Sequence, residues 1–324
     1  MRSGKYLLRK VLHALATLAF VLAFNFVLFR AIGDPVKLLT RSSVHLDPQE
    51  QELLREEFGI DDPLPQQFVN YLGDSLRGEF GYSFISGRPV MDSIQDRVWP
   101  TVLLVGTATI LSTVFGIMIG IKGAWRRGSA FDTGSLLGSL TLYSMPEGWL
   151  GMILLITFAG SETLGWFPAG GIESTDELTG MAHVLDVAKH LFLPCLTLTL
   201  GYIGEFAIIM RSSLLEVMGE DFVLTARAKG VRDKDVRRRH AVPNALLPTF
   251  TLAFYSIAFI LGGAVIVEQV FSWPGLGQLT YAAIQGSDYP VIQAVFLLSS
   301  AAVIFFNLLA DILYGYLDPR VKEG

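Results

Sequence analysis

The sequence predicts an all-α membrane protein, and three observations lead to this prediction. Hydrophobic residues make up 51% of the 324-residue chain and charged residues only 17%, and the mean hydropathy is +0.47. Soluble domains carry about a quarter charged residues, so this composition excludes a disordered chain and disfavours a water-soluble globule. Apolar runs long enough to cross a bilayer as helices recur along the chain. The only cysteine, Cys195, excludes an intrachain disulfide framework and a cysteine-rich metal site.

Six apolar stretches have the length of about 20 residues that a spanning helix needs. They lie approximately at residues 9–29, 101–121, 138–160, 191–211, 246–269 and 291–313. A signal peptide is the alternative for the first stretch, because basic residues precede it. Its apolar run, Val11 to Phe29, is longer than the roughly 7–15 residues of a signal-peptide core, and Arg30 follows it instead of a small-residue cleavage site. We therefore predict an uncleaved first span and six spanning helices with a small helical external segment after the first.

The distribution of basic residues predicts the orientation. With both termini in the cytoplasm, the cytoplasmic segments hold 17 of the 25 Lys and Arg residues, and these segments are short enough for the positive-inside rule. They comprise residues 1–10, 122–132, 211–240 and 318–324. The predicted organisation is a cytoplasmic N-terminus with the first span (1–30), an external segment (31–100), a five-helix core (101–317) with a cytoplasmic loop (212–246), and a cytoplasmic tail (318–324).

The external segment, residues 31–100, is too polar to enter lipid. Asp47 followed by Pro48 predicts the start of a short helix, and Gly59 its end. A second short helix is expected after Pro65, with an apolar face formed by Phe68, Leu72 and Leu76. Two functions stay open for this segment. It is either a connector or a docking surface for an external partner, which long loops in compact proteins often provide.

Acidic residues in or near the spans are candidates for a transport pathway, because an acid at the bilayer centre costs a few kcal/mol. The candidates are Glu205, Glu147 and Asp311, of which Glu205 is the best placed to line a cavity. The alternative is structural: Glu147 and Glu268 would lie in wet interfaces, and Asp311 would be paired within the bundle. The sequence leaves both interpretations open.

The cytoplasmic loop is basic and larger than a connector requires. Asp221 is expected to cap a two-turn helix that ends at Gly230. Asp233 is expected to cap a second short helix that passes through His240 and ends at Pro243. The loop is therefore expected to be two short helices joined by a tight turn.

Composition leaves two partners open for this loop. Anionic lipid headgroups would attract its basic side chains, while the small Ala226 and Ala228 would let a cytosolic protein approach closely. Nucleic acid is disfavoured, because the loop has neither interleaved aromatic residues nor a reading motif.

One motif in the loop is specific. It reads Thr225-Ala226-Arg227-Ala228-Lys229-Gly230 and is followed by His240-Ala241-Val242-Pro243. This pattern resembles the EAA loop of ABC-importer permeases, with the second Ala, the Gly and the Pro at the family's spacing. Leu224, Thr225, His240 and Val242 depart from the general pattern, and these departures are similar to the dipeptide, oligopeptide and nickel branch.

Other stretches in the same order strengthen the resemblance to this branch, from about residue 5 to residue 322. They include Gly33-Asp34-Pro35, Gly59-Ile60-Asp61-Asp62-Pro63-Leu64-Pro65, Gly87-Arg88-Pro89-Val90, Phe271-Ser272-Trp273-Pro274-Gly275-Leu276-Gly277, Asp288-Tyr289-Pro290 and Asp318-Pro319-Arg320. The external segment after the first span is similar to that of the B-type permease of the branch.

The resemblance implies a permease subunit in the inner membrane of a prokaryote, without cofactor or metal. It implies a homologous sister permease, two cytosolic ATPase subunits and an extracytoplasmic substrate-binding protein as partners. The coupling residues carried over from the motif are Asp221, Thr225, Ala226, Arg227, Ala228, Lys229, Gly230, His240 and Pro243. The chain has no G-x-x-x-x-G-K-[ST] phosphate loop, which agrees with ATP hydrolysis on partner subunits. Peptides are the expected substrate, with nickel and sugars as alternatives within the branch.

The competing function is a secondary transporter or channel that works without ATPases. It would use Glu147, Glu205 and Asp311 as an ion or proton path. Such a protein is expected to contain an inverted repeat with broken helices in both halves, and the sequence shows no convincing pair. An intramembrane enzyme is disfavoured as well, because no nucleophile–base or metal-ligand spacing appears.

Overall fold

The computed structural model describes residues 2–32, 52, 55, 62–160, 162–174, 178–258 and 260–317. Helices dominate this part of the chain, and its only strand-like pairing is an isolated bridge between Tyr82 and Pro89. The prediction of an all-α protein is therefore confirmed. The chain divides into two compact units. Unit 1 comprises residues 1–101, 261–265 and 274–324, and unit 2 comprises residues 102–260 and 266–273.

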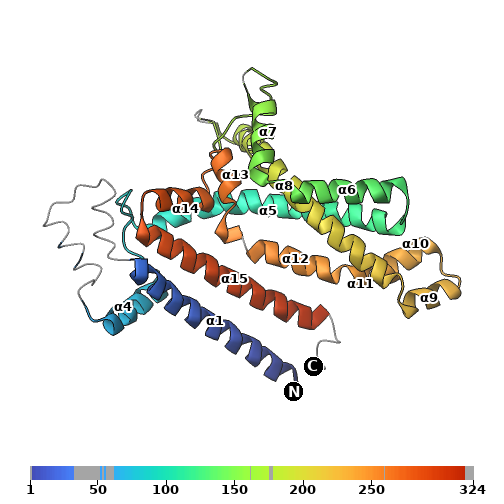
Figure 1. The fold of residues 1–324 in the computed structure, drawn as a ribbon, viewed down its shortest axis with the longest axis horizontal. Coiled ribbons are helices and arrows are strands. Elements are labelled where there is room, and N and C mark those ends of the chain that lie inside the picture. Colours follow the sequence, from blue (N-terminus) through green and yellow to red (C-terminus); the bar gives the residue numbers. More distant parts are fainter. Residues whose placement is uncertain are drawn as a thin grey trace. The chain divides into compact units, whose positions relative to one another are not determined.

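Unit 1 is built around two long helices, α1 (Arg2–Ile32) and α15 (Tyr289–Leu317), which pack along each other (Figure 1). Helix α4 (Leu64–Arg77) contacts α1, and α14 (Leu276–Gln285) contacts α15. The first part of α5 (Val90–Trp125) also belongs to this unit. Its apolar core joins these last elements through Val90, Ile94, Leu276, Ala283, Val291, Ala294 and Val295.

Unit 2 is organised around α8 (Met181–Val217), against which α6 (Ala130–Ser144), α7 (Glu147–Ala159) and α12 (Leu247–Ala258) pack. The remainder of α5 approaches α8 closely at two glycines. A Cβ atom at Gly116 would collide with the Cβ of Phe206, and one at Gly120 would lie 2.7 Å from the carbonyl oxygen of Ala207. Small residues at this four-residue spacing let membrane helices come together without side chains between them.

Four helices in the described residues are long and apolar enough to cross a membrane. They comprise Leu7–Arg30, Val90–Trp125, Met181–Val217 and Tyr289–Ile312, which correspond to the predicted spans at 9–29, 101–121, 191–211 and 291–313. The predicted span at 138–160 corresponds to α6 and α7, which meet at a bend of 98° at Met145-Pro146. If this bent pair is one span, the number rises to five.

The predicted fifth span, residues 246–269, is not one continuous helix. Helix α12 ends at Ala258, a short 3₁₀ turn covers Ile260–Gly262, and α13 covers Val265–Val270. Gly263 between them has φ +71°, a left-handed conformation that interrupts a helix and that glycine adopts without steric cost. Six spans therefore remain a prediction in this segment.

The prediction for the external segment is partly corrected by the structure. Helix α4 confirms the helix expected near Pro65, and it ends at Gly78, whose φ is +76°. Phe68 packs edge-on against Phe26 at 5.3 Å, whereas Leu76 is 77% exposed, so the expected apolar face is only partly buried. Residues 90–100, which were assigned to the external segment, form the first turns of α5. The helix expected between Asp47 and Gly59, apart from residues 52 and 55, and the tail 318–324 lie outside the described residues.

Candidate coupling loop

The first helix of the loop is α9 (Asp221–Ala228). Asp221 is its first residue and not its cap, because Glu220 occupies the cap position and makes no side-chain capping bond. The predicted end is confirmed. Gly230 has φ +74°, its N–H donates to the carbonyl of Arg227 at 2.9 Å, and the N–H of Val231 donates to the carbonyl of Ala226 at 3.2 Å. These two bonds form a Schellman motif, which satisfies the last carbonyls of the helix.

The second half of the loop differs from the expectation. Helix α10 (Asp233–Asp235) follows Arg232, so Asp233 is not its cap, and a π-helical turn covers Val236–Ala241. Pro243 does not end the helix but stands in the first turn of α11 (Val242–Ala245). A proline in a continuous α-helix would remove a hydrogen bond and clash with the preceding turn. The wider π turn before α11 separates Pro243 from a regular α-helical turn, which accounts for the continuing helical path.

The inner face of the loop packs against the ends of two long helices. Val223 and Ala226 of α9 are buried in a cluster that includes Ala124 of α5 and Met210 and Leu214 of α8. Ala226 is only 7% exposed. The interpretation of Ala226 as part of a docking face is therefore wrong, because its methyl group points into the protein.

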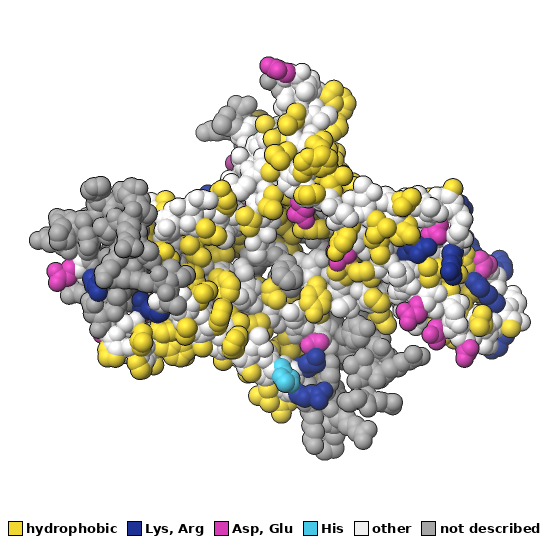
Figure 2. Space-filling model, in the orientation of Figure 1, with side chains coloured by type: hydrophobic (Ala, Val, Ile, Leu, Met, Phe, Trp, Pro, Cys, Tyr) yellow, Lys and Arg dark blue, Asp and Glu magenta, His cyan; other side chains and the backbone are white. Residues whose placement is uncertain are grey.

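The outer face of α9 comprises the exposed residues Phe222, Leu224, Thr225, Arg227, Ala228 and Lys229. Phe222 is 38% exposed and Leu224 50% exposed, which leaves apolar surface among basic side chains. Figure 2 shows Lys, Arg, Asp and Glu side chains gathered at this end of unit 2. His240, by contrast, is half-buried and its carbonyl accepts a bond from Asn244, whereas Pro243 is exposed.

Trp125, the last residue of α5, holds the two halves of the loop together. Its Nε1–H donates to a carboxylate oxygen of Asp233 at 2.9 Å. The guanidinium carbons of Arg227 and Arg237 lie 5.6 Å and 5.7 Å from the centre of its ring system, within the range of cation–π attraction. Arg227 also approaches Asp233 at 3.8 Å. One indole thus contacts α9, α10 and the π turn. This role was not predicted, because Trp125 lies 102 positions before Arg227 along the chain.

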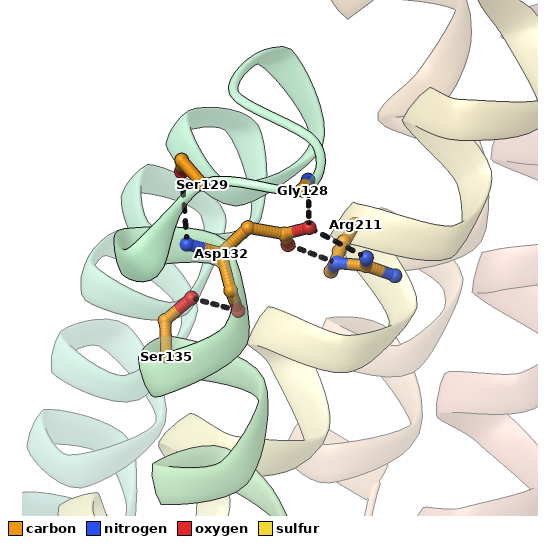
Figure 3. A network of polar contacts seen from close by, with 5 residues as sticks. All are labelled: Gly128, Ser129, Asp132, Ser135 and Arg211. Carbon is orange, nitrogen blue, oxygen red and sulfur yellow. Dashed lines mark hydrogen bonds and ion pairs between the residues drawn. The ribbon is translucent and has the colours of Figure 1, made fainter.

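A second set of contacts that joins elements of unit 2 lies at the start of α6 (Figure 3). Arg211 of α8 donates to both carboxylate oxygens of Asp132, at 2.6 Å and 3.0 Å, and the N–H of Gly128 donates to one of them at 2.9 Å. The Asp132 side chain is 5% exposed. Asp132 lies before the predicted span at 138–160, and the hydrogen bonds from Arg211 and Gly128 lower its pKa to about 2. The pair ties the loop after α5 to the part of α8 that leads into α9.

Comparison with known families identifies the chain. The model of the binding-protein-dependent transport system inner membrane component matches residues 112–323, and the model of the N-terminal part of such components matches residues 4–105. The chain belongs to this family. The permease is thus an integral inner-membrane component of an ABC transporter that works with other subunits, and ATP hydrolysis takes place on separate subunits.

Named relatives of the permease match nearly end to end. The probable peptide ABC transporter permease protein y4tP of Sinorhizobium fredii is 38% identical, over 98% of this chain and 99% of that protein. The oligopeptide transport system permease protein AppB of Bacillus subtilis is 36% identical, also over 98% and 99%. The glutathione transport system permease protein GsiC of Escherichia coli is 36% identical over 98% of each chain.

The candidate pathway residues of the permease separate into two groups. In unit 2, the Glu147 side chain reaches to within 4 Å of the position that a Cβ atom on Gly201 would take, so it lies against α8. In unit 1, the Nζ of Lys10 donates to Asp311 at 2.8 Å, which joins α1 to α15. Asp311 therefore takes the paired role that the sequence had left open.

Two further observations concern Glu268 and metal binding in the permease. Glu268 is fully buried, so the expected wet interface around it is wrong. Among the described residues, no group of three or more His, Cys, Asp or Glu side chains is arranged to hold a metal ion.

Proposed function

We propose that the permease forms half of the translocation pathway of an ATP-driven importer of di- or oligopeptides. Its proposed partners are a homologous sister permease, two cytosolic ATPase subunits and an extracytoplasmic substrate-binding protein, with both termini of the permease in the cytoplasm. The substrate class is supported by the names of relatives, which refer to peptides, oligopeptides and glutathione. The orientation is supported by the concentration of basic residues in the short segments on one side.

One observation supports a coupling role for α9. The outer face of α9 exposes apolar side chains, while its inner face is packed on the ends of α5 and α8. A partner can drive a two-state membrane bundle only if it binds the two states differently. A partner that binds the outer face of α9 would move α5 and α8 with it, because Trp125 of α5 bonds to the loop and the inner face of α9 packs on Met210 and Leu214 of α8. We therefore assign the outer face of α9 to an ATPase subunit.

The competing secondary transporter receives less support. It would need its carboxylates free to exchange ions, and Asp311 is already bonded to Lys10.

The test uses two charge substitutions on the outer face, Leu224→Asp and Ala228→Asp. Both side chains are exposed, so the loop should fold, while a buried carboxylate at a contact should weaken ATPase binding at least about tenfold, or about 1.4 kcal/mol. Ala130→Asp is the matched control, because Ala130 is exposed at the start of α6, where a negative charge is tolerated.

The readouts are co-purification of the ATPase subunits in mild detergent and uptake of a labelled oligopeptide into proteoliposomes. The control should keep both, and the two outer-face variants should lose both. Normal ATPase recovery and uptake with Leu224→Asp and Ala228→Asp would show that the outer face of α9 is not the coupling surface. Uptake by the permease without ATPases or nucleotide would support the secondary transporter.

A further inference from the structure

Unit 1 contains a cavity of about 710 Å³ that the proposed transport function does not use. It lies between the end of α1, helix α4, the segment 79–84 and the start of α15. Its volume falls within the range of about 300–1,000 Å³ that is usual for small-molecule sites. Gly73 of α4 lines it, and a Cβ atom added there would meet no atom within 4 Å, so the space beside this helix is open.

The cavity lies at the edge of two membrane spans. The span in α1 ends at Arg30, and the span in α15 begins at Tyr289. Phe26, Phe29 and Arg30 form one wall of the cavity, and Tyr289 is part of another. Arginine and aromatic residues at span ends are typical of the interface between hydrocarbon and lipid headgroups. The cavity therefore opens at headgroup depth on the side predicted to be external.

The residues that line the cavity include aromatic side chains and charged groups of both signs. Arg30 and Arg77 supply two guanidinium groups, and Asp62, Asp74 and Glu79 supply three carboxylates. Guanidinium groups bind phosphate through paired N–H donors, and carboxylates bind a primary ammonium group. A headgroup with a phosphate and a primary amine can pair with both kinds of charge.

Toward the N-terminus, beyond the buried Leu22, the same face of α1 forms a lipid-accessible stripe. At the three-to-four-residue spacing of a helix face, it passes through Leu15, Leu12 and Leu8, which are 56%, 56% and 58% exposed. An acyl chain that leaves the cavity can lie along these side chains. A headgroup site with an apolar track beneath it has the form of a phospholipid site.

We propose that this cavity binds the headgroup of a zwitterionic phospholipid that carries a phosphate and a primary amine. Arg77 holds the phosphate, Asp74 and Glu79 hold the amine, and the acyl chains lie along α1. Such a lipid would stabilise the contact between α4 and α1, whose described part rests on Phe26 with Phe68 and Tyr71.

The test measures lipid retention by the full-length permease in detergent, with native mass spectrometry and no nucleotide or substrate. Delipidated protein is incubated with an ethanolamine phospholipid or with phosphatidylglycerol. The wild type should retain the ethanolamine lipid preferentially. Gly73→Phe should fill the cavity and reduce retention at least tenfold, while Leu76→Phe, on the same helix but outside the cavity, should not.

Two charge variants test the binding of the headgroup's phosphate and of its amine separately. Arg77→Gln should reduce the retention of both lipids. Arg88 is an exposed external arginine outside the cavity, so Arg88→Gln should reduce the retention of neither. Asp74→Asn should remove the preference for the ethanolamine lipid. Equal retention of both lipids by the wild type would overturn the assignment of the amine.

Two results would overturn the proposal as a whole. One is unchanged lipid retention by Gly73→Phe, in a variant whose thermal unfolding matches that of Leu76→Phe. The other is a Gly73→Phe variant that keeps its lipid but no longer binds the purified substrate-binding protein, which would make the cavity a protein-docking site. Neither result bears on the coupling role of α9, since no ATPase takes part in the measurement.

Discussion

At the scale of single residues, the Asp132 carboxylate holds the start of α6 against α8. It is bonded to Arg211 and to the backbone of Gly128, and it is nearly buried. The Asp96 carboxylate, in contrast, meets Arg88 at 3.0 Å with both side chains more than half exposed. Solvent screens the exposed pair, whereas removal of one partner from a buried pair leaves an uncompensated charge.

We expect Asp132→Asn to destabilise the permease by about 3 kcal/mol, because Arg211 would lose a buried counter-charge. Asp96→Asn, the exposed control, should cost less than about 1 kcal/mol. The measurement is thermal unfolding of both variants in the same detergent. Equal unfolding temperatures for the two variants would contradict the structural role of Asp132.

The pH dependence of the same pair follows from its lowered pKa. The folded-state pKa of Asp132 is about 2, below the unfolded value of about 3.9, so its contribution to stability is present above pH 4 and is lost as the pH falls toward 2. The stability difference between wild type and Asp132→Asn should therefore stay constant between pH 5 and pH 8. A difference that shrinks within this range would show that the carboxylate is not held in its charged form.

Asp288 has a comparable role in unit 1. It is 2% exposed and accepts hydrogen bonds from the Ser83 hydroxyl at 2.5 Å, from the Phe84 N–H at 3.0 Å and from the Ile85 N–H at 3.3 Å. Asp288→Ala should destabilise this unit by about 1–3 kcal/mol, because three donors lose their acceptor. Limited proteolysis should detect faster cleavage at residues 83–89, and exposed Asp92→Ala should leave the cleavage rate unchanged.

At the scale of elements, local signals predicted some boundaries and missed others. The end of α9 at Gly230 was predicted because a glycine in the left-handed conformation is a local stop. The inward direction of Ala226 was missed, since its burial depends on Ala124 and Met210, which lie far away in the sequence. Pro243 was misread because a π turn lets a helical path continue through it, and no local pattern marks such a turn.

The Schellman motif at Gly230 gives a prediction for α9. Gly230→Ala should cost about 1 kcal/mol, because an alanine at φ +74° is strained. Hydrogen exchange at the amides of Gly230 and Val231 should become faster. Gly219→Ala is the control, since a Cβ atom there would make only an ordinary contact, 3.4 Å from the carbonyl oxygen of Glu216. Similar exchange in the two variants would contradict the motif's role.

Trp125 is predicted to act as a positioning residue for the coupling loop. Trp125→Ala removes the bond to Asp233 and both cation–π contacts, so force on α9 should reach α5 less directly. We expect ATP hydrolysis to continue while oligopeptide uptake per ATP falls several-fold, and Trp125→Phe should recover part of the loss through its ring. An unchanged ratio of uptake to hydrolysis, with ATPase binding intact, would rule out this role.

At the scale of the whole molecule, the membrane class and four spans were predictable because they depend on average hydropathy over long windows. The bend between α6 and α7 and the break after α12 were not, since they depend on a few backbone positions, such as Gly263, that a window average hides. The anchors of the candidate site were also missed. Asp132 and Arg211 are 79 residues apart, and their pairing follows from how helices pack, which no local pattern encodes.

Contacts within the units restrict the number of crossings. Asp132 and Arg211 bond to each other, so they lie on one side of the membrane. Because α8 crosses between them, the bent pair α6–α7 must cross as well. Ser83 and Asp288 also bond to each other, so the number of crossings between them is even. With α5, α6–α7 and α8 counted, we expect the broken segment α12–α13 to supply the fourth crossing, which would agree with the six-span prediction.

Single-cysteine labelling tests this topology, since Cys195 is the only native cysteine and is buried. In a Cys195→Ala background, cysteines at the exposed positions Arg88 and Gln285 should react with an impermeant maleimide added outside cells. Cysteines at exposed Ala130 and Ala228 should react only after the membrane is opened, because the basic segments that contain them stay in the cytoplasm. Labelling of Gln285→Cys only from the inside would mean that α12–α13 turns back within the bilayer. The Ser83–Asp288 bond could not then form across the membrane, and the arrangement of unit 1 would be wrong together with the six-span topology.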